Sequence, residues 1–249
     1  MSEIIYDCRW SDRLDDKFIQ DFLDTANAVF GGGFTRELFQ RKYQDNIYGN
    51  SVVVVVYLDG NPVAARGLWR NDIGGKESYQ PGDTCVLEVC RGKGVFTEMT
   101  KQSMALLPED ARVYNFPNRN SYPGYIKMGW HLVGDYGMVL FSGVKEFFRE
   151  HPQTMDKAYA DWWLSDDAGF YSMKVGASYF LVRPMYRFCY KICAAVERET
   201  AERFPKMPPG ICFYRSKKKT FYNKHLGLPL HVVSKQTIDY VPIWKMDVI

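Results

Sequence analysis

The sequence has 249 residues, a formal net charge of +3, 46% hydrophobic residues and 16% aromatic residues. This length allows one large domain or two small ones with a substantial core. The small positive charge does not by itself indicate a nucleic-acid-binding surface. The N-terminal residues are charged and lack the apolar segment of a signal peptide, and no apolar run is long enough to cross a bilayer. We therefore expect a cytoplasmic protein.

The cysteines form neither a metal-binding nor a disulfide pattern. The six are Cys8, Cys85, Cys90, Cys189, Cys193 and Cys212. None of them makes a C-x-x-C pair, and no histidines cluster beside them, which argues against a zinc site. Without a signal peptide a disulfide framework is not expected either. We predict no metal, and we interpret Cys85 and Cys90 as thiols in the core.

The first part of the chain predicts alternating strands and helices. Residues 3–8 have the pattern of a strand, and residues 15–30 carry apolar side chains at helical spacing until a run of three glycines ends the helix. Thr35 can cap a second helix. The run V-V-V-V-V within residues 51–58 is apolar on both faces and predicts a central strand. The turn D-G-N-P then leads into a hairpin partner, V-A-A-R-G-L-W-R.

The most informative stretch is T-C-V-L-E-V-C-R-G-K-G-V-F-T, residues 84–97. It predicts a buried strand over residues 84–90, a basic glycine turn, and a helix that begins at Val95. Unpaired amides at a helix start and a glycine-rich approach make an anion site, most simply for a phosphate or pyrophosphate. Neither the Walker nor the Rossmann glycine spacing is present. From these residues alone, an ordinary turn with solvated Arg91 and Lys93 is equally compatible.

This turn resembles the R-G-x-G-[IV] turn of the GNAT superfamily of acyl-CoA-dependent N-acetyltransferases, which holds the pyrophosphate of coenzyme A on backbone amides. Phe96 departs from the family, which has Gly or Ala there. A second segment, residues 115–130, is similar in its latter part to the family signature N-x-x-A-x-x-L-Y-x-K-x-G-F. The positions that match are Asn118, Ser121 in place of Ala, Tyr125, Lys127, Gly129 and Trp130 in place of Phe, with Gly124 where the family has Leu.

The predicted element order through residue 142, β-α-α-β-β-β-α-β-α-β, is also the GNAT order. The fold class expected is therefore α/β (α+β), a GNAT-like mixed and mostly antiparallel sheet flanked by helices and extended by a second, smaller, degenerate GNAT-like half. We expect an acyl-CoA-binding catalytic domain at residues 1–143. The remainder, residues 144–249, is expected to cover the acceptor site.

For the C-terminal half, the sequence predicts a hairpin that turns at Gly176-Ala177, a long basic and aromatic helix over residues 184–204, and a strand at 211–214. Such a helix could lie on a membrane surface, although a packed helix with a solvated stripe is the commoner case. The segment from Ile211 echoes the Tyr125 region, with Tyr222, Lys224 and Gly227 at the comparable places. A solvated loop is the usual role of its basic cluster, Arg215, Lys217, Lys218 and Lys219, and attraction of an anionic acceptor or nucleic acid is the alternative.

The resemblance implies direct attack of an acceptor amine on the thioester of acetyl-CoA or another short acyl-CoA, through a tetrahedral oxyanion. It implies Tyr125 as the general acid. The general base is predicted among Glu88 and Asp83, with water relayed to the solvent as a rival. The residues expected to bind the coenzyme, including an oxyanion donor among the first three, are Cys85, Val86, Leu87, Arg91, Gly92, Lys93, Gly94, Val95, Phe96, Thr97, Asn118 and Ser121.

The acceptor expected is a small-molecule primary amine. An amino sugar or sugar nucleotide is favoured because the turn and the Tyr125 segment look like those of family members associated with surface-polysaccharide synthesis. We expect no membrane or nucleic-acid partner, and a homodimer is compatible with the sequence. The alternative function is a noncatalytic nucleic-acid- or protein-binding module on a GNAT scaffold.

Overall fold

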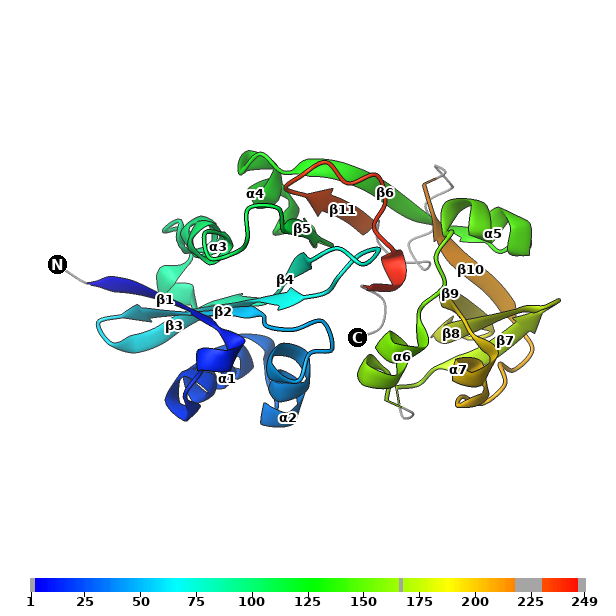
Figure 1. Cartoon of the computed structure of the whole chain (residues 1–249), viewed down its shortest axis with the longest axis horizontal. Coiled ribbons are helices and arrows are strands. Elements are labelled where there is room, and N and C mark those ends of the chain that lie inside the picture. Colours follow the sequence, from blue (N-terminus) through cyan, green and yellow to red (C-terminus); the bar gives the residue numbers. More distant parts are fainter. Residues whose placement is uncertain (1–2, 166–167, 218–229, 246–249) are drawn as a thin grey trace. The chain divides into compact units, whose positions relative to one another are not determined.

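The computed structural model describes residues 3–165, 168–217 and 230–245 (Figure 1). The chain forms two compact units, each made of several segments. Unit 1 comprises Met1–Asn115, Pro123–His131 and Ser234–Thr237, and unit 2 comprises Phe116–Tyr122, Leu132–Val233 and Ile238–Ile249. The division into domains at residues 143 and 144 stays a prediction.

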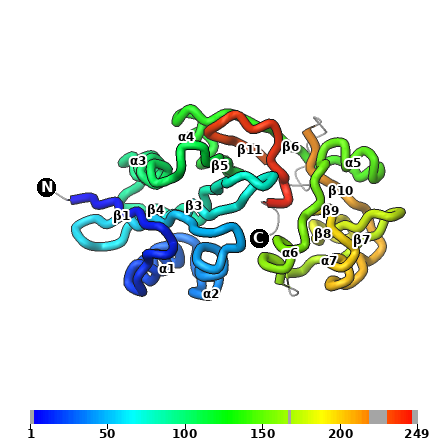
Figure 2. The backbone as a smooth tube through the Cα atoms, in the orientation of Figure 1, coloured from blue at the N-terminus to red at the C-terminus, as the bar shows by residue number. Residues whose placement is uncertain are grey.

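Unit 1 is a sheet with helices on both faces (Figures 1 and 2). Its elements are β1 (Ile4–Trp10), α1 (Asp16–Phe30), α2 (Arg36–Phe39), β2 (Val52–Leu58), β3 (Asn61–Arg70), β4 (Ser78–Val86), α3 (Val95–Met104), β5 (Arg112–Asn115) and α4 (Tyr122–Lys127). The strands lie in the order β1-β2-β3-β4-β5. Neighbouring strands are antiparallel except β4 and β5, which are parallel. The predicted mixed, mostly antiparallel sheet is confirmed.

The α1 helix shows why the sequence pattern was informative. The Asp15 side chain accepts a hydrogen bond from the Phe18 amide at 2.8 Å, which caps the first turn. The helix ends at Gly31, whose backbone is left-handed (φ 80°) and whose amide donates to the Asn27 carbonyl. The apolar side chains at helical spacing, among them Phe22, are buried against the sheet.

The valine run forms β2, a strand between β1 and β3 whose residues Val52–Val56 are completely buried. Asp59 and Gly60 form the turn into β3 with positive φ angles of 49° and 81°. A strand with a neighbour on each edge and helices on each face has no solvent-facing side, so it needs apolar residues at consecutive positions. The predicted central strand and hairpin are confirmed.

The prediction for the next strand was wrong in its limits. β4 begins at Ser78 and ends at Val86, whereas residues 84–90 were expected to be the strand. Glu88–Cys90 instead form a 3-10 turn, in which the Cys90 amide bonds the Leu87 carbonyl at 2.9 Å and the Arg91 amide bonds the Glu88 carbonyl at 3.1 Å. Apolar periodicity cannot distinguish a last strand residue from a tight turn that buries one side chain, here Cys90.

Unit 2 contains a second set of strands. Its elements are β6 (His131–Leu140), α5 (Val144–Glu150), α6 (Lys157–Trp163), β7 (Tyr171–Val175), β8 (Ser178–Tyr186), β9 (Cys189–Val196), α7 (Arg198–Glu202), β10 (Ile211–Ser216) and β11 (Leu230–Ser234). The strands lie in the order β11-β6-β10-β9-β8-β7. Among the described residues, no helix is long and apolar enough to pass through a membrane.

The long helix predicted over residues 184–204 is wrong. The chain there forms the end of β8, a tight turn with Arg187 at φ 45°, and β9, and only the five residues Arg198–Glu202 are helical. β7 pairs with β8 only as far as Val182, so Pro184 lies beyond that ladder and its missing N–H breaks no bond to β7. The predicted turn at Gly176-Ala177 and the strand from Ile211 are confirmed. The residues of the sequence echo, Tyr222, Lys224 and Gly227, lie outside the described residues.

After unit 2 the chain returns to the edge of β5 in unit 1. The Lys235 amide donates to the Val113 carbonyl at 2.9 Å. The Gln236 side chain accepts from the Val113 amide at 2.9 Å and donates to the Ala111 carbonyl at 2.7 Å. These three hydrogen bonds satisfy backbone groups on one edge of β5 with residues more than one hundred positions away in sequence.

A glycine in β3 leads to a prediction about stability. A Cβ at Gly67 would lie 2.2 Å from the Tyr43 hydroxyl, and Tyr43 is buried. We expect Gly67→Ala to lower the free energy of unfolding by about 1–3 kcal/mol through overpacking. Gly82→Ala is the matched control, since Gly82 pairs with Gly67 and its new Cβ would come no closer than 3.5 Å to any neighbour. Chemical denaturation that gives equal losses for both variants would contradict the packing argument.

Candidate functional site

The glycine turn lies where the sequence placed it, between the end of β4 and the start of α3. Arg91, Gly92, Lys93 and Gly94 are exposed, and the two glycines have positive φ angles of 74° and 79°. The first amides to bond the Gly94 carbonyl are those of Thr97 and Glu98. The amides that precede them stand outside the hydrogen bonds of the helix. An exposed run of such amides at the positive end of a helix can bind an anionic group.

The register of β4 with β3 selects one of the three predicted oxyanion donors. Val86 pairs with Ala64, and the Leu87 amide donates to the Val63 carbonyl at 2.8 Å. In an antiparallel ladder this makes Val86 and Ala64 a non-hydrogen-bonded pair, so the amides of Cys85 and Leu87 point toward β3 and that of Val86 points to the opposite edge. In the described part of the chain, β4 pairs with β5 on that edge only at Ser78 and Tyr79. The Val86 amide is therefore directed to a part of the edge beyond the β5 ladder.

Tyr125 lies in α4 and is only 1% exposed. Its hydroxyl oxygen accepts hydrogen bonds from the Arg66 guanidinium and, at 2.7 Å, from the Asn115 amide. Its ring packs edge-on against Phe96 and Trp130, with centroid distances of 5.5 and 4.6 Å. Burial raises the pKa of Tyr125, and the charge of Arg66 and the two hydrogen bonds oppose this rise. The predicted general acid is therefore protonated at neutral pH and held in one position.

Two departures from the family signature contact each other. Phe96, which stands where the family has a small residue, extends toward α4 and the Tyr125 ring. A Cβ placed on Gly124, where the family has Leu, would lie 3.0 Å from the Phe96 ring. The large side chain has moved from one helix to the other, so the space between α3 and α4 stays filled.

The two predicted bases have different surroundings. Asp83 sits at a β-bulge in β4 with φ 49°. Its carboxylate accepts hydrogen bonds from Lys42 at 2.8 and 3.0 Å and from the Tyr43 hydroxyl at 2.5 Å. Glu88 is exposed at the start of the 3-10 turn. The structure therefore gives Asp83 a fixed position and leaves Glu88 facing the solvent.

Other predicted site residues have local structural contacts. The Asn118 side-chain oxygen accepts hydrogen bonds from the backbone amides of Asn120 and Ser121, both at 3.0 Å. The backbone carbonyl of Asn118 accepts from the Tyr122 amide, so Asn118 shapes the start of α4. Cys85 is buried and its thiol points to the Ala65 carbonyl. Burial raises the pKa of Cys85 to about 12, which fits a thiol in the core.

Sequence reasoning missed the side chains that surround the Tyr125 hydroxyl. Arg66 is the most informative of them, because it is a charged residue inside the otherwise apolar run V-A-A-R-G-L-W. A charge in a strand covered on both faces must find polar partners in the core. The sequence could therefore have predicted that Arg66 has polar partners in the core. Sequence reasoning also missed Lys42 and Tyr43 as the partners of Asp83. Nothing in the sequence marked them, because both lie within an ordinary amphipathic helical pattern.

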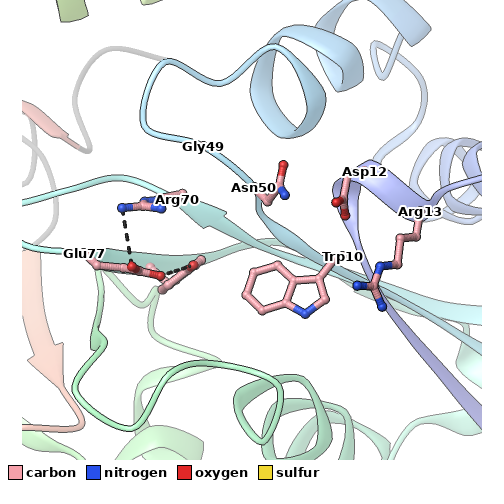
Figure 3. Close-up of a pocket in the computed structure, with 8 residues that line it drawn as sticks. Trp10, Asp12, Arg13, Gly49, Asn50, Arg70 and Glu77 are labelled. Carbon is pink, nitrogen blue, oxygen red and sulfur yellow. Dashed lines mark hydrogen bonds and ion pairs between the residues drawn. The ribbon is translucent and has the colours of Figure 1, made fainter.

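A cavity of about 470 Å³ is lined in part by Glu77 and Tyr79 at the start of β4, the end opposite the glycine turn. Figure 3 shows the residues that line it. Arg70 on one wall makes ion pairs with Asp72 at 3.1 Å and Glu77 at 3.5 Å. The lining residues are Trp10, Asp12, Arg13, Gly49, Asn50, Arg70, Glu77 and Tyr79. None of the predicted site residues belongs to this set, so the cavity is separate from the candidate site.

The contact between Phe96 and Gly124 can be tested by a double-mutant cycle. Gly124→Leu should destabilise unit 1 by about 1–3 kcal/mol, because Phe96 occupies the required space. Adding Phe96→Ala should relieve this loss, with a coupling energy of about 0.5–3 kcal/mol measured by denaturant unfolding. Ile192→Val, a core change in unit 2, should instead add independently to Gly124→Leu. A coupling energy near zero for the first pair would show that the two positions are not complementary.

Comparison with known proteins places this fold. No protein-family model matches the sequence, and no curated protein matches it. The chain is similar to a candidate acetyltransferase from Pyrococcus horikoshii, with 12% identity, a TM-score of 0.54, and 98% of this chain and 92% of that chain covered.

Two other solved structures are similar over most of this chain. A protein of unknown function from Enterococcus faecalis, named a probable N-acyltransferase, matches with 13% identity, a TM-score of 0.55 and coverage of 92% of this chain and 72% of that one. A GCN5-related N-acetyltransferase from Kribbella flavida matches with 12% identity, a TM-score of 0.53 and coverage of 92% and 71%. The chain has the fold of the GCN5-related N-acetyltransferases, the GNAT fold.

Proposed function

We propose that this protein is an N-acyltransferase that moves an acetyl or other short acyl group from acyl-CoA to a primary amine. One observation carries the proposal. Phe96, two residues after Gly94, packs at 5.5 Å against the ring of Tyr125. The turn suited to a diphosphate and the phenol suited to proton transfer are thus joined through one side-chain contact, although they come from separate segments of the sequence.

In the proposed reaction, the amides from Gly92 to Phe96 hold the diphosphate of the coenzyme, with Arg91 and Lys93 beside them. The thioester carbonyl accepts a hydrogen bond from the Val86 amide, which stabilises the oxyanion formed by direct attack of the amine. Tyr125 protonates the departing thiolate. Asp83, Glu88 or a water relay takes the proton of the acceptor ammonium.

For the acceptor we propose a small molecule, in particular an amino sugar or a sugar nucleotide, on the sequence resemblance described above. The coenzyme contacts of Asn118 and Ser121, the covering role of residues 144–249, a cytoplasmic location and a homodimer remain proposals of the same kind. Incubation with acetyl-CoA and a panel of amino sugars, followed by mass spectrometry, tests the acceptor directly. A transfer product confined to amines of another class would replace the amino-sugar proposal.

The role of Tyr125 can be separated from coenzyme binding. We expect Tyr125→Phe to lower kcat by about 10²- to 10⁴-fold, the usual contribution of a general acid, with little change in the Kd for coenzyme A. Thiol release from acetyl-CoA gives kcat, and calorimetry gives Kd. Tyr136→Phe is the control, because Tyr136 is an equally buried tyrosine in unit 2. Wild-type turnover in Tyr125→Phe would remove this phenol from the mechanism.

The glycine turn can be tested with two glycines of similar backbone strain. Gly94 and Gly75 have φ angles of 79° and 70°, and a Cβ at either would meet no atom within 4 Å. Gly94→Ala should weaken coenzyme A binding at least about tenfold, because an L side chain there reshapes the turn that aims the amides. Gly75→Ala carries a similar strain in another loop and should leave the affinity unchanged. If calorimetry gives Gly94→Ala the same affinity for coenzyme A as Gly75→Ala and the wild type, the coenzyme does not bind at this turn.

A further inference from the structure

Arg66 is a cation in the core of unit 1. The residue is completely buried, and across the described ranges no carboxylate lies within ion-pair distance of its guanidinium. Its Nε is also buried there without a hydrogen-bond partner. Burial of an unpaired charge is strongly unfavourable unless other groups compensate it. Such a residue is therefore expected to have a role that an apolar side chain could not fill.

The contacts of Arg66 converge on Tyr125 and α3. One terminal nitrogen donates to the Thr100 hydroxyl and the other donates to the Tyr125 hydroxyl. The Thr100 hydroxyl gives its own proton to the Phe96 carbonyl at 2.6 Å, so toward Arg66 it can only accept. The guanidinium carbon also lies 4.9 Å from the Phe96 ring centroid, a cation–π distance. These contacts fix the guanidinium beside the phenol.

The Tyr125 oxygen is the acceptor in both of the hydrogen bonds described above. Arg66 and Asn115 both donate to it, and together they use both of its lone pairs. Within the described part of the chain the hydroxyl proton has no acceptor, so the proton remains available for transfer. Donors that point at an oxygen stabilise its ionised form more than its neutral form. The site is thus built to hold a phenolate as well as a phenol.

We propose that Arg66 is a positioning residue that stabilises the phenolate of Tyr125 formed when the phenol gives up its proton. This inference rests on the proposed function. In the acyl-transfer reaction the O–H bond of Tyr125 breaks, an S–H bond forms on the leaving thiolate, and the phenolate later recovers a proton from water. No other reactant is required.

Among the described residues that contact Tyr125, one carries a charge. β3 contributes Arg66, α3 contributes Phe96 and β5 contributes Asn115. Trp130, which follows α4, packs on the ring. Arg66 alone carries a charge among them. Burial raises the pKa of this phenol and the Arg66 charge lowers it, whereas an ordinary thiol has a pKa of about 8.5. Removal of the cation would make proton transfer to a thiolate less favourable.

Ionisation of one phenol can be followed in the full-length protein with fluorotyrosine at position 125 and ¹⁹F NMR. We expect Arg66→Met to raise the titration midpoint by about one pH unit or more, the effect of losing an adjacent opposite charge. Arg66→Gln keeps an amide donor without the charge and should shift the midpoint the same way. The titration midpoint of Arg66→Lys should remain nearer to that of the wild type, because lysine keeps the positive charge. Thr100→Val is the control, because it removes the other acceptor of Arg66 and leaves the charge beside Tyr125.

Kinetics supply a second measurement. In Arg66→Gln, kcat should fall about tenfold or more while KM for acetyl-CoA stays within about twofold, and the basic limb of the kcat–pH profile should move to higher pH with the NMR midpoint. A folded Arg66→Gln or Arg66→Met protein whose midpoint matches the wild type would overturn the proposal. If the wild type releases no thiol with any amine, the transferase proposal fails, and the ¹⁹F titration still decides whether Arg66 stabilises the phenolate.

Discussion

The burial of the Arg66 charge is the constraint on which the arrangement of unit 1 depends. Arg66 lies in β3 opposite the bulge in β4, where two residues of β4 face one of β3. The Asp83 carboxylate of that bulge is bound by Lys42 and Tyr43. The sheet therefore has a neutral ion pair at Asp83, while the Arg66 cation is compensated by hydroxyl and aromatic groups. A cation in such surroundings costs several kcal/mol on the usual scale for buried charges, up to about 5 kcal/mol when a partner is absent.

The departures from the GNAT signature become intelligible as one change. Phe96 and Gly124 exchange the large and small positions of the family, and the exchange puts an aromatic ring against both Arg66 and Tyr125. A small residue at position 96 would remove a cation–π partner from a guanidinium that has few partners. The unusual residue in the glycine turn thus belongs to the environment of the phenol, and the backbone of the turn keeps both glycines.

Local patterns predicted unit 1 well, because each of its features has a short-range cause. The cap at Asp15, the left-handed glycine at 31 and the valine run identify α1 and β2 without knowledge of the fold. Failures occurred where distant pairing decides the outcome. Residues 184–204 have helical spacing and aromatic bulk, but the ladder between β8 and β9 makes strands of residues 184–186 and 189–196. The partners of Tyr125 come from three separate elements, so spacing along the chain could find Tyr125 and could not find its hydrogen bonds.

The return of Lys235 and Gln236 to β5 affects how the protein is made. The hydrogen bond between Val113 and Gln236 spans 123 residues, and unit 1 receives its last segment only after the intervening chain. Closing a loop of that length is entropically slow compared with forming local helices and hairpins. During synthesis on the ribosome, β5 therefore emerges long before the residues that cover its edge, and we expect it to be prone to nascent-chain aggregation until Lys235 and Gln236 have been made.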